Sequence, residues 1–201
     1  TVTADWAKSY EFTNYSDEFI AGITRLSNGN YCYVAQGVSA GGVNYDSFVG
    51  IADASGNPVW SRQVTIPGAG ILLSAVVEMD NGELLVAGNS SNYAGVVLKF
   101  SAAGTLLWKK TIPAAGGIII CGLLTKRLSG ELALTGYMGG NSLLVQMDAV
   151  GSNCIFESDT VTSVTPVTPF VTNLPPFVIS SQIKNSGPGS FSSRNLSPVM
   201  T

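Results

Sequence analysis

The sequence contains no histidine, and only 11% of its 201 residues are charged. Without histidine there is no Ser-His-Asp or Cys-His catalytic group, no imidazole base and no imidazole metal ligand. Soluble domains usually carry about 25% charged residues, so the surface of this protein is unusually neutral. A net charge of −3 also excludes the basic face that nucleic-acid binding requires.

Long apolar runs and a paired set of cysteines are missing too. No stretch approaches the 18 or so apolar residues of a transmembrane helix, and the segment after Thr1 lacks the basic start and apolar core of a signal peptide. If Thr1 is a processed end, export is the natural expectation. Cys32, Cys121 and Cys154 are odd in number and lack metal-site spacing, so they are either buried small apolar residues or one disulfide plus a free thiol.

An internal repeat organises the chain. Segments 27–37, 80–88 and 128–136 each begin with a tight turn and continue into a short apolar strand that ends in glycine. The turn glycines, at positions 29, 82 and 130, are 53 and 48 residues apart, and those of a second turn, at positions 56, 104 and 151, are 48 and 47 apart. Two independent markers therefore share one period of about 48 residues.

Each period holds four strand candidates. In the second unit they are residues 72–79, 83–87, 95–100 and 105–112, and Asp80-Asn81-Gly82 is a hairpin turn of the Asn-Gly type. The strands are almost continuously apolar, which indicates sheets covered on both faces. A four-stranded unit of this length is typical of a β-propeller blade.

The units resemble the secreted bacterial and archaeal propeller-type repeats of the delta-60 and PQQ-like kind. Their pattern of turn glycine, apolar strand, Ala-Gly and Trp-x-Lys is matched by residues 80–88 and 104–110, and Trp60-Ser-Arg62 keeps the ending with arginine. The third unit departs from it, because Ile155-Phe156 replaces the tryptophan. The resemblance covers about residues 1–158. It implies an all-β fold and no particular function.

We therefore expect three propeller-type repeats of four strands, at 19–67, 70–113 and 117–158. Residues 1–12 form an orphan strand, because Trp6-Ala-Lys8-Ser-Tyr10 resembles Trp108-Lys-Lys110-Thr-Ile112 and lacks three preceding strands. Propellers normally have at least four blades. The orphan strand could complete the third unit, pair with another copy, or contribute to a dimeric ring or a filament. The chain could also be a fragment of a longer protein.

From residue 160 to 201 the composition changes. These 42 residues hold six of the nine prolines and 14 serines or threonines, but only two charged side chains. Apolar residues such as Val171 and Ile179 are more frequent than in a free tail, although a disordered linker is the alternative. We expect an extended arm that docks on its own repeats or on a neighbour.

Candidate packing and assembly residues are the large aromatic side chains of the repeats and of the arm. Tryptophans in propellers usually pack blade against blade, whereas tyrosines near turns could bind the apolar face of a sugar. The packing set is Trp6, Tyr10, Trp60, Trp108, Phe170 and Phe177, and the tyrosines near turns are Tyr31, Tyr33, Tyr45, Tyr93 and Tyr137.

The carboxylates show no pattern of a metal or catalytic site, so we expect no metal, cofactor or catalytic residue. Acids at strand ends are turn caps in this interpretation, and Glu83 and Glu131 occupy equivalent repeat positions. The strand-end acids are Asp46, Asp53, Asp80 and Asp148, and the possible glycosylation sites, each expected in a loop or in the tail, are Asn14, Asn89 and Asn195.

The functional expectation is a non-enzymatic extracellular structural protein whose copies self-assemble into a filament or surface layer by exchanging strands or arms. Low charge and a mean hydropathy of +0.30 favour association. An adhesion or glycan-binding module is the alternative, and an enzyme using carboxylates alone is a more distant one.

Overall fold

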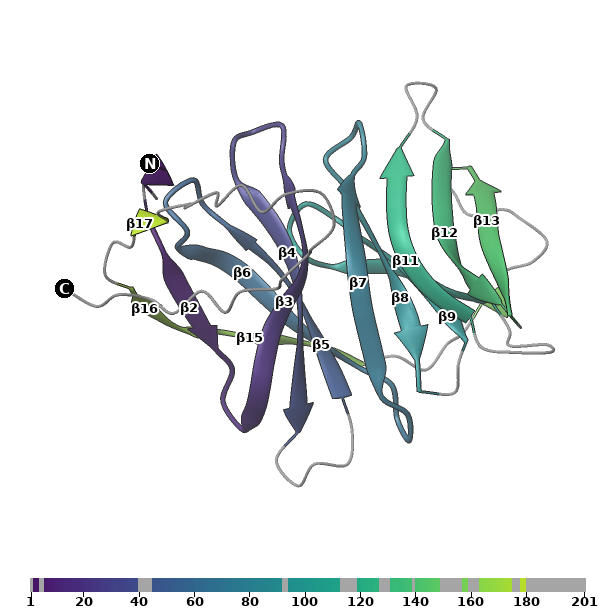
Figure 1. Cartoon of the computed structure of the whole chain (residues 1–201), viewed down its shortest axis with the longest axis horizontal. Helices are drawn as coiled ribbons and strands as arrows, with labels where there is room; N and C mark the ends of the chain where they lie inside the picture. Colours follow the sequence, from purple (N-terminus) through teal and green to yellow (C-terminus); the bar gives the residue numbers. More distant parts are fainter. Residues whose placement is uncertain are drawn as a thin grey trace, which may run out of the picture.

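The computed structural model describes residues 2–3, 6–39, 45–91, 94–112, 119–126, 131–138, 140–148, 157–158, 163–174 and 178–179. Within these ranges every regular element is a β-strand, which confirms the all-β prediction. Three antiparallel sheets lie side by side along the long axis of the molecule (Figure 1).

The first sheet contains β3 (Tyr15–Arg25), β4 (Tyr31–Ser39), β5 (Tyr45–Ala52) and β6 (Pro58–Thr65). The second contains β7 (Ile71–Glu78), β8 (Leu84–Ser90), β9 (Gly95–Phe100) and β10 (Leu106–Ile112). The third contains β11 (Ile119–Lys126), β12 (Leu132–Met138) and β13 (Asn141–Met147). Outside these meanders lie β1 (Val2–Thr3), β2 (Lys8–Glu11), β14 (Glu157–Ser158), β15 (Ser163–Val167), β16 (Phe170–Asn173) and β17 (Val178–Ile179).

The strand registers follow the spacing of the sequence repeat. Ile23 lies opposite Tyr33 in the first sheet, and Val76 lies opposite Val86, 53 residues further on, in the second. A register shift recurs at the same place in all three sheets, after Ile20, Leu73 and Cys121. A bulge inserts one residue and increases the local twist. The first strands of the three sheets, β3, β7 and β11, therefore have the same irregularity at equivalent positions.

The third sheet corrects the expectation of four strands in every unit. By its spacing the repeat assigns residues 153–159 to a fourth strand, yet Glu157 and Ser158 pair with Thr111 and Lys110 of β10. Residues 149–156 lie outside the described part of the chain. The orphan strand β2 does not complete this sheet either, because it pairs with β16. No closed ring of sheets is found among the residues the structure describes.

The arm, together with the short strand β14 just before it, runs back along the outer edges of the strands that end each unit. β14 pairs with β10, β15 with β6, and β16 with β2, always antiparallel. These contacts recur every seven or eight residues, because Glu157, Thr165 and Thr172 lie opposite Thr111, Gln63 and Ser9, which are equivalent positions. Of the two placements expected for the arm, residues 160–201, the structure therefore shows docking on its own chain for β15 and β16. Residues 180–201 are outside the described ranges.

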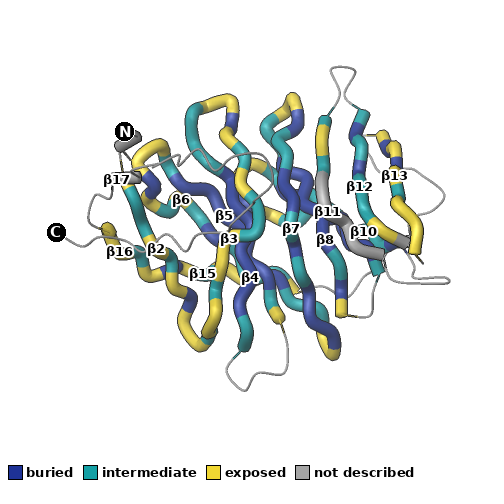
Figure 2. Tube along the Cα trace, in the orientation of Figure 1, coloured by how far each residue is buried: buried dark blue, intermediate teal, exposed yellow. Residues whose placement is uncertain are grey.

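The core lies in three clusters: one on each side of the second sheet, and a third on the outer face of the first sheet, where Phe12 packs with Tyr33 and Phe48. Leu73, Val76 and Val86 pack against Cys32 and Val34 of the first sheet. On the opposite face, Leu85, Ala87 and Val97 pack against residues of the third sheet that include Leu132 and Leu134. Figure 2 shows buried segments along β4, β5 and β8, with more exposed ones on β13 and on parts of β2 and β3. Burial on both faces explains the continuous apolar runs, as the sequence predicts.

Candidate functional site

A tryptophan at the start of a fourth strand joins the first sheet to the second. Trp60 Nε1 donates a hydrogen bond to the carbonyl oxygen of Ala102 at 3.0 Å, and Arg62 Nε donates to the carbonyl of Gly104 at 3.0 Å. Gly104 has φ +79°, and a Cβ atom placed there would lie 2.9 Å from the Trp60 ring. The turn therefore requires glycine both for its backbone conformation and for contact with the ring.

The orphan strand makes the same contact with the first sheet. Trp6 Nε1 donates to the carbonyl of Ala54 at 3.0 Å, and a Cβ on Gly56 would lie 2.7 Å from the Trp6 ring. Ala54 and Gly56 precede Ala102 and Gly104 by 48 residues, so the two contacts are equivalent. Lys8 Nζ donates to the side-chain oxygen of Asn57, in the place of the arginine. Strand β2 therefore contacts the first sheet in the same way as β6, the last strand of the first sheet, contacts the second sheet.

The inner part of the first sheet is uncovered on the side where that preceding sheet would stand. Ile20 and Ile23 on β3 are 46% and 61% exposed. They lie opposite Ala35 and Tyr33, as Leu73 and Val76 lie opposite Gly88 and Val86 in the second sheet. Leu73 and Val76, however, are only 0% and 8% exposed, because the first sheet covers them. We call the surface formed by Ile20 and Ile23 the leading face.

A groove separates the leading face from β2. Its volume is about 310 Å³, and Tyr10 and Ser9 of β2 face Ile20 and Phe19 of β3 across it. Lys8 and Glu18 also contribute to its lining. The groove lies where the inner strands of a covering sheet would enter, and its walls are already formed by this chain.

At the opposite end of the molecule, the third sheet exposes the face that points away from the second sheet. Leu144 on β13 lies opposite Thr135 and is 73% exposed. Its equivalents in the other two sheets, Val49 and Val97, are fully buried because the next sheet covers them. Tyr137, on β12, is 44% exposed. We call the surface formed by Leu144 and Tyr137 the trailing face.

The two end faces were not identified from the sequence, although the signal was present. Aligning the units on their turn glycines places Ile20, Ile23 and Leu144 at positions that are apolar in the second unit, at Leu73, Val76 and Val97. Whether a side chain at one of these positions is buried or exposed depends on the number of sheets in the stack and on which sheets lie at its ends. The alignment of the units shows neither the number of sheets nor the ends of the stack.

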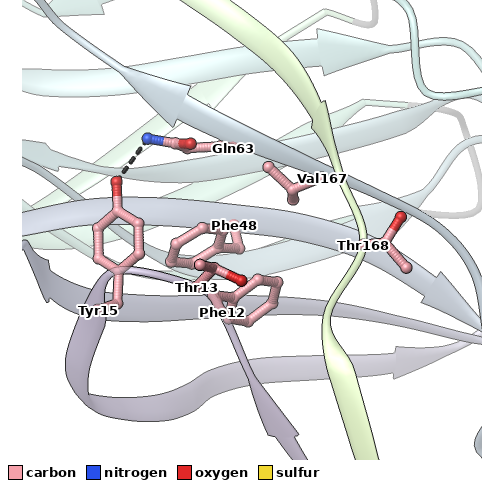
Figure 3. A pocket seen from close by; sticks show the side chains of 7 residues that line it. All are labelled: Phe12, Thr13, Tyr15, Phe48, Gln63, Val167 and Thr168. Atoms are coloured by element: carbon pink, nitrogen blue, oxygen red, sulfur yellow. Dashed lines mark hydrogen bonds between the residues drawn. The ribbon is translucent and has the colours of Figure 1, made fainter.

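A small pocket lies under the arm at the edge of the first sheet. Figure 3 shows Phe12 and Phe48 beside Tyr15, with Val167 and Thr168 of the arm across from them. Its volume is about 170 Å³, below the range of about 300–1,000 Å³ that is usual for ligand sites. The two phenylalanine rings stack at 3.8 Å between centroids.

The polar groups of this pocket bind one another. Tyr15 donates to Asp46 Oδ2 at 2.5 Å, and Gln63 Nε2 donates to the Tyr15 oxygen at 2.5 Å. Burial and the hydrogen bond to Asp46 raise the pKa of Tyr15, so the phenol stays protonated. Such a closed network anchors β3 and the turn before it, and we assign the pocket to packing.

The remaining aromatic candidates are distributed between the core and the surface. The Tyr10 hydroxyl donates to the carbonyl of Gly56 at 2.6 Å, and its ring lies 5.2 Å from that of Tyr33. Trp108 packs on the apolar layer between the second and third sheets. Phe170 of β16 is 69% exposed, and Phe177 lies outside the described residues.

The tyrosines considered for sugar binding do not gather on one surface. Tyr33 is buried, Tyr31 touches the edge of Trp6, and Tyr45 and Tyr137 are exposed at different sheets. Tyr93 lies outside the described residues. The structure thus brings no pair of these exposed rings together.

Most of the acids of the described turns hold neighbouring backbone or basic groups. Asp53 accepts hydrogen bonds from the side-chain amide and the backbone N–H of Asn57 and from the backbone N–H of Ser55, and these bonds lower its pKa. Glu78 accepts from the Ser27 backbone N–H at 2.7 Å and thereby links the first two sheets. Ion pairs join Asp80 to Lys126 and Glu83 to Lys99, while Glu131 and Asp148 also have interactions of their own.

The described residues contain no group of three acidic or cysteine side chains that could hold a metal ion. In the same ranges no helix is long and apolar enough to cross a membrane. Cys32 is a buried free thiol, and desolvation raises its pKa to about 12. The side chain of Cys121 and the whole of Cys154 lie outside what the structure describes.

The glycosylation sites predicted from the sequence differ in accessibility. Asn14 is exposed in the turn between β2 and β3, with φ 70°. Asn89 lies within β8 and is half-buried, so the expectation of a loop is wrong there because the strand extends to Ser90. Asn195 lies outside the described residues.

Comparison with known proteins shows a similarity of fold alone. No protein-family model matches the chain, and no curated protein is significantly similar to it in sequence. A crystal structure of a protein of unknown function from Bacteroides caccae is similar, with a TM-score of 0.41 and 12% sequence identity. The similarity covers 66% of this chain and 47% of the Bacteroides protein, so this chain spans less than half of that protein's length.

Proposed function

We propose that this protein is a structural subunit that associates head to tail with copies of itself in an extracellular assembly. The single observation that carries the proposal is the exposure of Ile20, Ile23 and Leu144 at positions whose repeat equivalents are buried between sheets. The leading face of one copy and the trailing face of another are the two sides of a contact that this chain already makes twice within itself.

The energetics favour such a contact. Burying an apolar side chain of this size contributes roughly 1.5–3 kcal/mol relative to leaving it exposed. The chain has few charges to keep its copies apart, at a net charge of −3. A contact between two different surfaces of the same molecule propagates into a ring or a filament, depending on the rotation between copies. The accessible acceptor asparagine Asn14 supports the extracellular part of the proposal.

Light scattering of the purified protein over a concentration series tests the association. We expect a mass that rises above the 20.9 kDa of one chain as the concentration increases. A constant monomer mass throughout the series would overturn the proposal. Immunogold electron microscopy of the source cells tests the location, and label confined to the cell interior would overturn the extracellular assignment.

A further inference from the structure

Strand β2 is a fourth strand that has no third strand beside it. In the first and second sheets, the fourth strands β6 and β10 each pair on one edge with a third strand. On the other edge β6 pairs with β15 of the arm and β10 pairs with β14. β2 pairs with the arm strand β16 and, among the described residues, with no third strand. Its inner edge therefore presents backbone N–H and C=O groups that can accept another strand.

The sequence before Trp6 does not match the repeat at the position of the turn glycine. In the first and second sheets the residue four places before this tryptophan position is the turn glycine, at Gly56 or Gly104. Before Trp6 it is Val2, which lies in β1 opposite Ile179 of β17. At this position β1 pairs with β17, in place of the turn glycine that joins the third and fourth strands of the first and second sheets.

Strand β13 has the complementary deficiency. It is the third strand of its sheet and pairs with β12, and no described strand lies along its other edge. Glu157 and Ser158, which the repeat would place on that edge, lie on β10. Among the described residues, one end of the molecule therefore offers a fourth strand, while the other end has a third strand with no fourth strand beside it.

We infer that β2 of one copy completes the third sheet of the next copy by pairing with β13. The inference rests on the proposed head-to-tail association and specifies its backbone contact. The occupant of the β13 edge is a second copy of this chain, because β2 already has the seat, the arm strand and the tryptophan contact of a fourth strand. The same docking would bring the trailing face of one copy over the leading face of the other.

The registers inside the chain fix the register between copies. In the first sheet Arg62 lies opposite Val49, and in the second Lys110 lies opposite Val97. By equivalent position, Lys8 of β2 lies opposite Leu144 of the neighbouring β13. The pairing retains a basic residue with a long aliphatic stem opposite an apolar residue, as in both internal sheets. The remaining pairs in this register are Trp6 with Gln146, Ala7 with Val145, Ser9 with Leu143, Tyr10 with Ser142, and Glu11 with Asn141.

Disulfide cross-linking between two variants of the full chain, each carrying one added cysteine beside the three native ones, tests this register. Copies with Lys8→Cys are mixed with copies carrying Leu144→Cys under a mild oxidant, and the bond is located by peptide mass spectrometry. Directly opposed residues of an antiparallel pair have Cα atoms about 4.5–5.5 Å apart, within the range that a disulfide spans. We expect a covalent dimer linked through positions 8 and 144 in the mixture and in neither variant alone.

Matched controls separate this register from chance collisions. Val59 on β6 is 56% exposed, so Val59→Cys mixed with Leu144→Cys measures random encounter at a comparable surface residue. The unmodified protein under the same oxidant reports any bond through the native cysteines. The pair Glu11→Cys and Asn141→Cys is a second test at the other end of the ladder, should either variant of the first pair lose the β-sheet circular dichroism of the parent.

The outcomes distinguish the strand pairing from the association itself. Cross-links at 8–144 and 11–141 at least tenfold above the Val59 control support the pairing. Assembly by light scattering together with cross-links no higher than that control would overturn the pairing while the proposed function stands. A protein that stays monomeric and uncross-linked would overturn both.

Discussion

The second sheet and the two end sheets have equivalent strands but different surroundings. The second sheet is covered on both faces, so Leu73 and Val97 are fully buried. Each end sheet packs against another of the three large sheets on one face only. Tyr10 and Phe12 cover part of the outer face of the first sheet, but Ile20 and Leu144, which are equivalent to Leu73 and Val97, are exposed. The difference shows that the apolar pattern belongs to the repeat, whereas its burial depends on the neighbours. The end faces therefore have a sequence suited to contact, and no sheet among the described residues covers Ile20 or Leu144.

The largest expected effect comes from removing equivalent side chains in a covered and an uncovered sheet. Leu73→Ala creates a cavity between the first two sheets and should reduce the free energy of unfolding by about 2–5 kcal/mol. Ile20→Ala, at the equivalent position of β3, should change it by about 0.5 kcal/mol or less in the monomer. Urea unfolding at low protein concentration measures both, and equal losses would break the comparison.

A second contrast concerns two turn glycines of the second unit. Gly104 and Gly82 have similar positive φ values, 79° and 77°, but only Gly104 lies against a tryptophan ring. Alanine in this conformation costs about 1–2 kcal/mol, which is the whole loss expected for Gly82→Ala. Gly104→Ala should be more destabilising, because its Cβ would also displace Trp60. Thermal unfolding of both variants measures the two losses of stability. A Gly82→Ala variant as unstable as Gly104→Ala would show that the contact with the Trp60 ring contributes nothing.

Alkaline pH should weaken the layer between the first and second sheets. The Cys32 pKa of about 12 exceeds its ordinary value of 9.0, so folding favours the protonated thiol. This contribution is complete below about pH 9 and is lost as pH rises toward 12; at pH 10 the loss is on the order of 1 kcal/mol. Unfolding titrations at pH 8 and pH 10 should show a smaller decrease for Cys32→Ala than for the parent, after correction for their difference at pH 8. An identical decrease would contradict the assignment.

The smallest expected effect is a loss of stability at acid pH that arises from the turn of the first unit and not from the equivalent turn of the second. Asp53 has a lowered pKa because its carboxylate accepts hydrogen bonds from Asn57 and Ser55, whereas the equivalent residue of the second unit, Ser101, does not ionise. The stabilisation by Asp53 is present above the ordinary pKa of 3.8 and disappears as pH falls through the lowered value. Melting temperatures of the parent and of Asp53→Ser should converge as the pH falls below about 4; a constant difference would contradict the pKa assignment.

The sequence predicted the parts of the fold that depend on local pattern. In the second unit the third strand, residues 95–100, was predicted with its observed bounds, and the other three differ by up to three residues at an end. The turn glycines and apolar runs carry this information because tight turns and buried strands restrict residue type.

What the sequence did not predict depends on long-range pairing. β14 and the arm strands β15 and β16 pair along outer edges, where composition restricts the chain little. The pairing of Glu157 with Thr111, rather than a place in the third sheet, depends on which edge is nearest to the returning chain. The exposed end faces likewise required knowledge of how many sheets the stack contains.

The central claim is that the leading and trailing faces bind one another, and mixing two blocked variants tests it most directly. Ile23→Glu places a charge on the leading face and Leu144→Glu places one on the trailing face, while each variant retains the other face intact. Sedimentation velocity should show that each variant alone is monomeric at a concentration where the parent associates, and that an equimolar mixture forms dimers and nothing larger. Variants that associate as the parent does, or a mixture that stays monomeric although the parent assembles, would contradict the account.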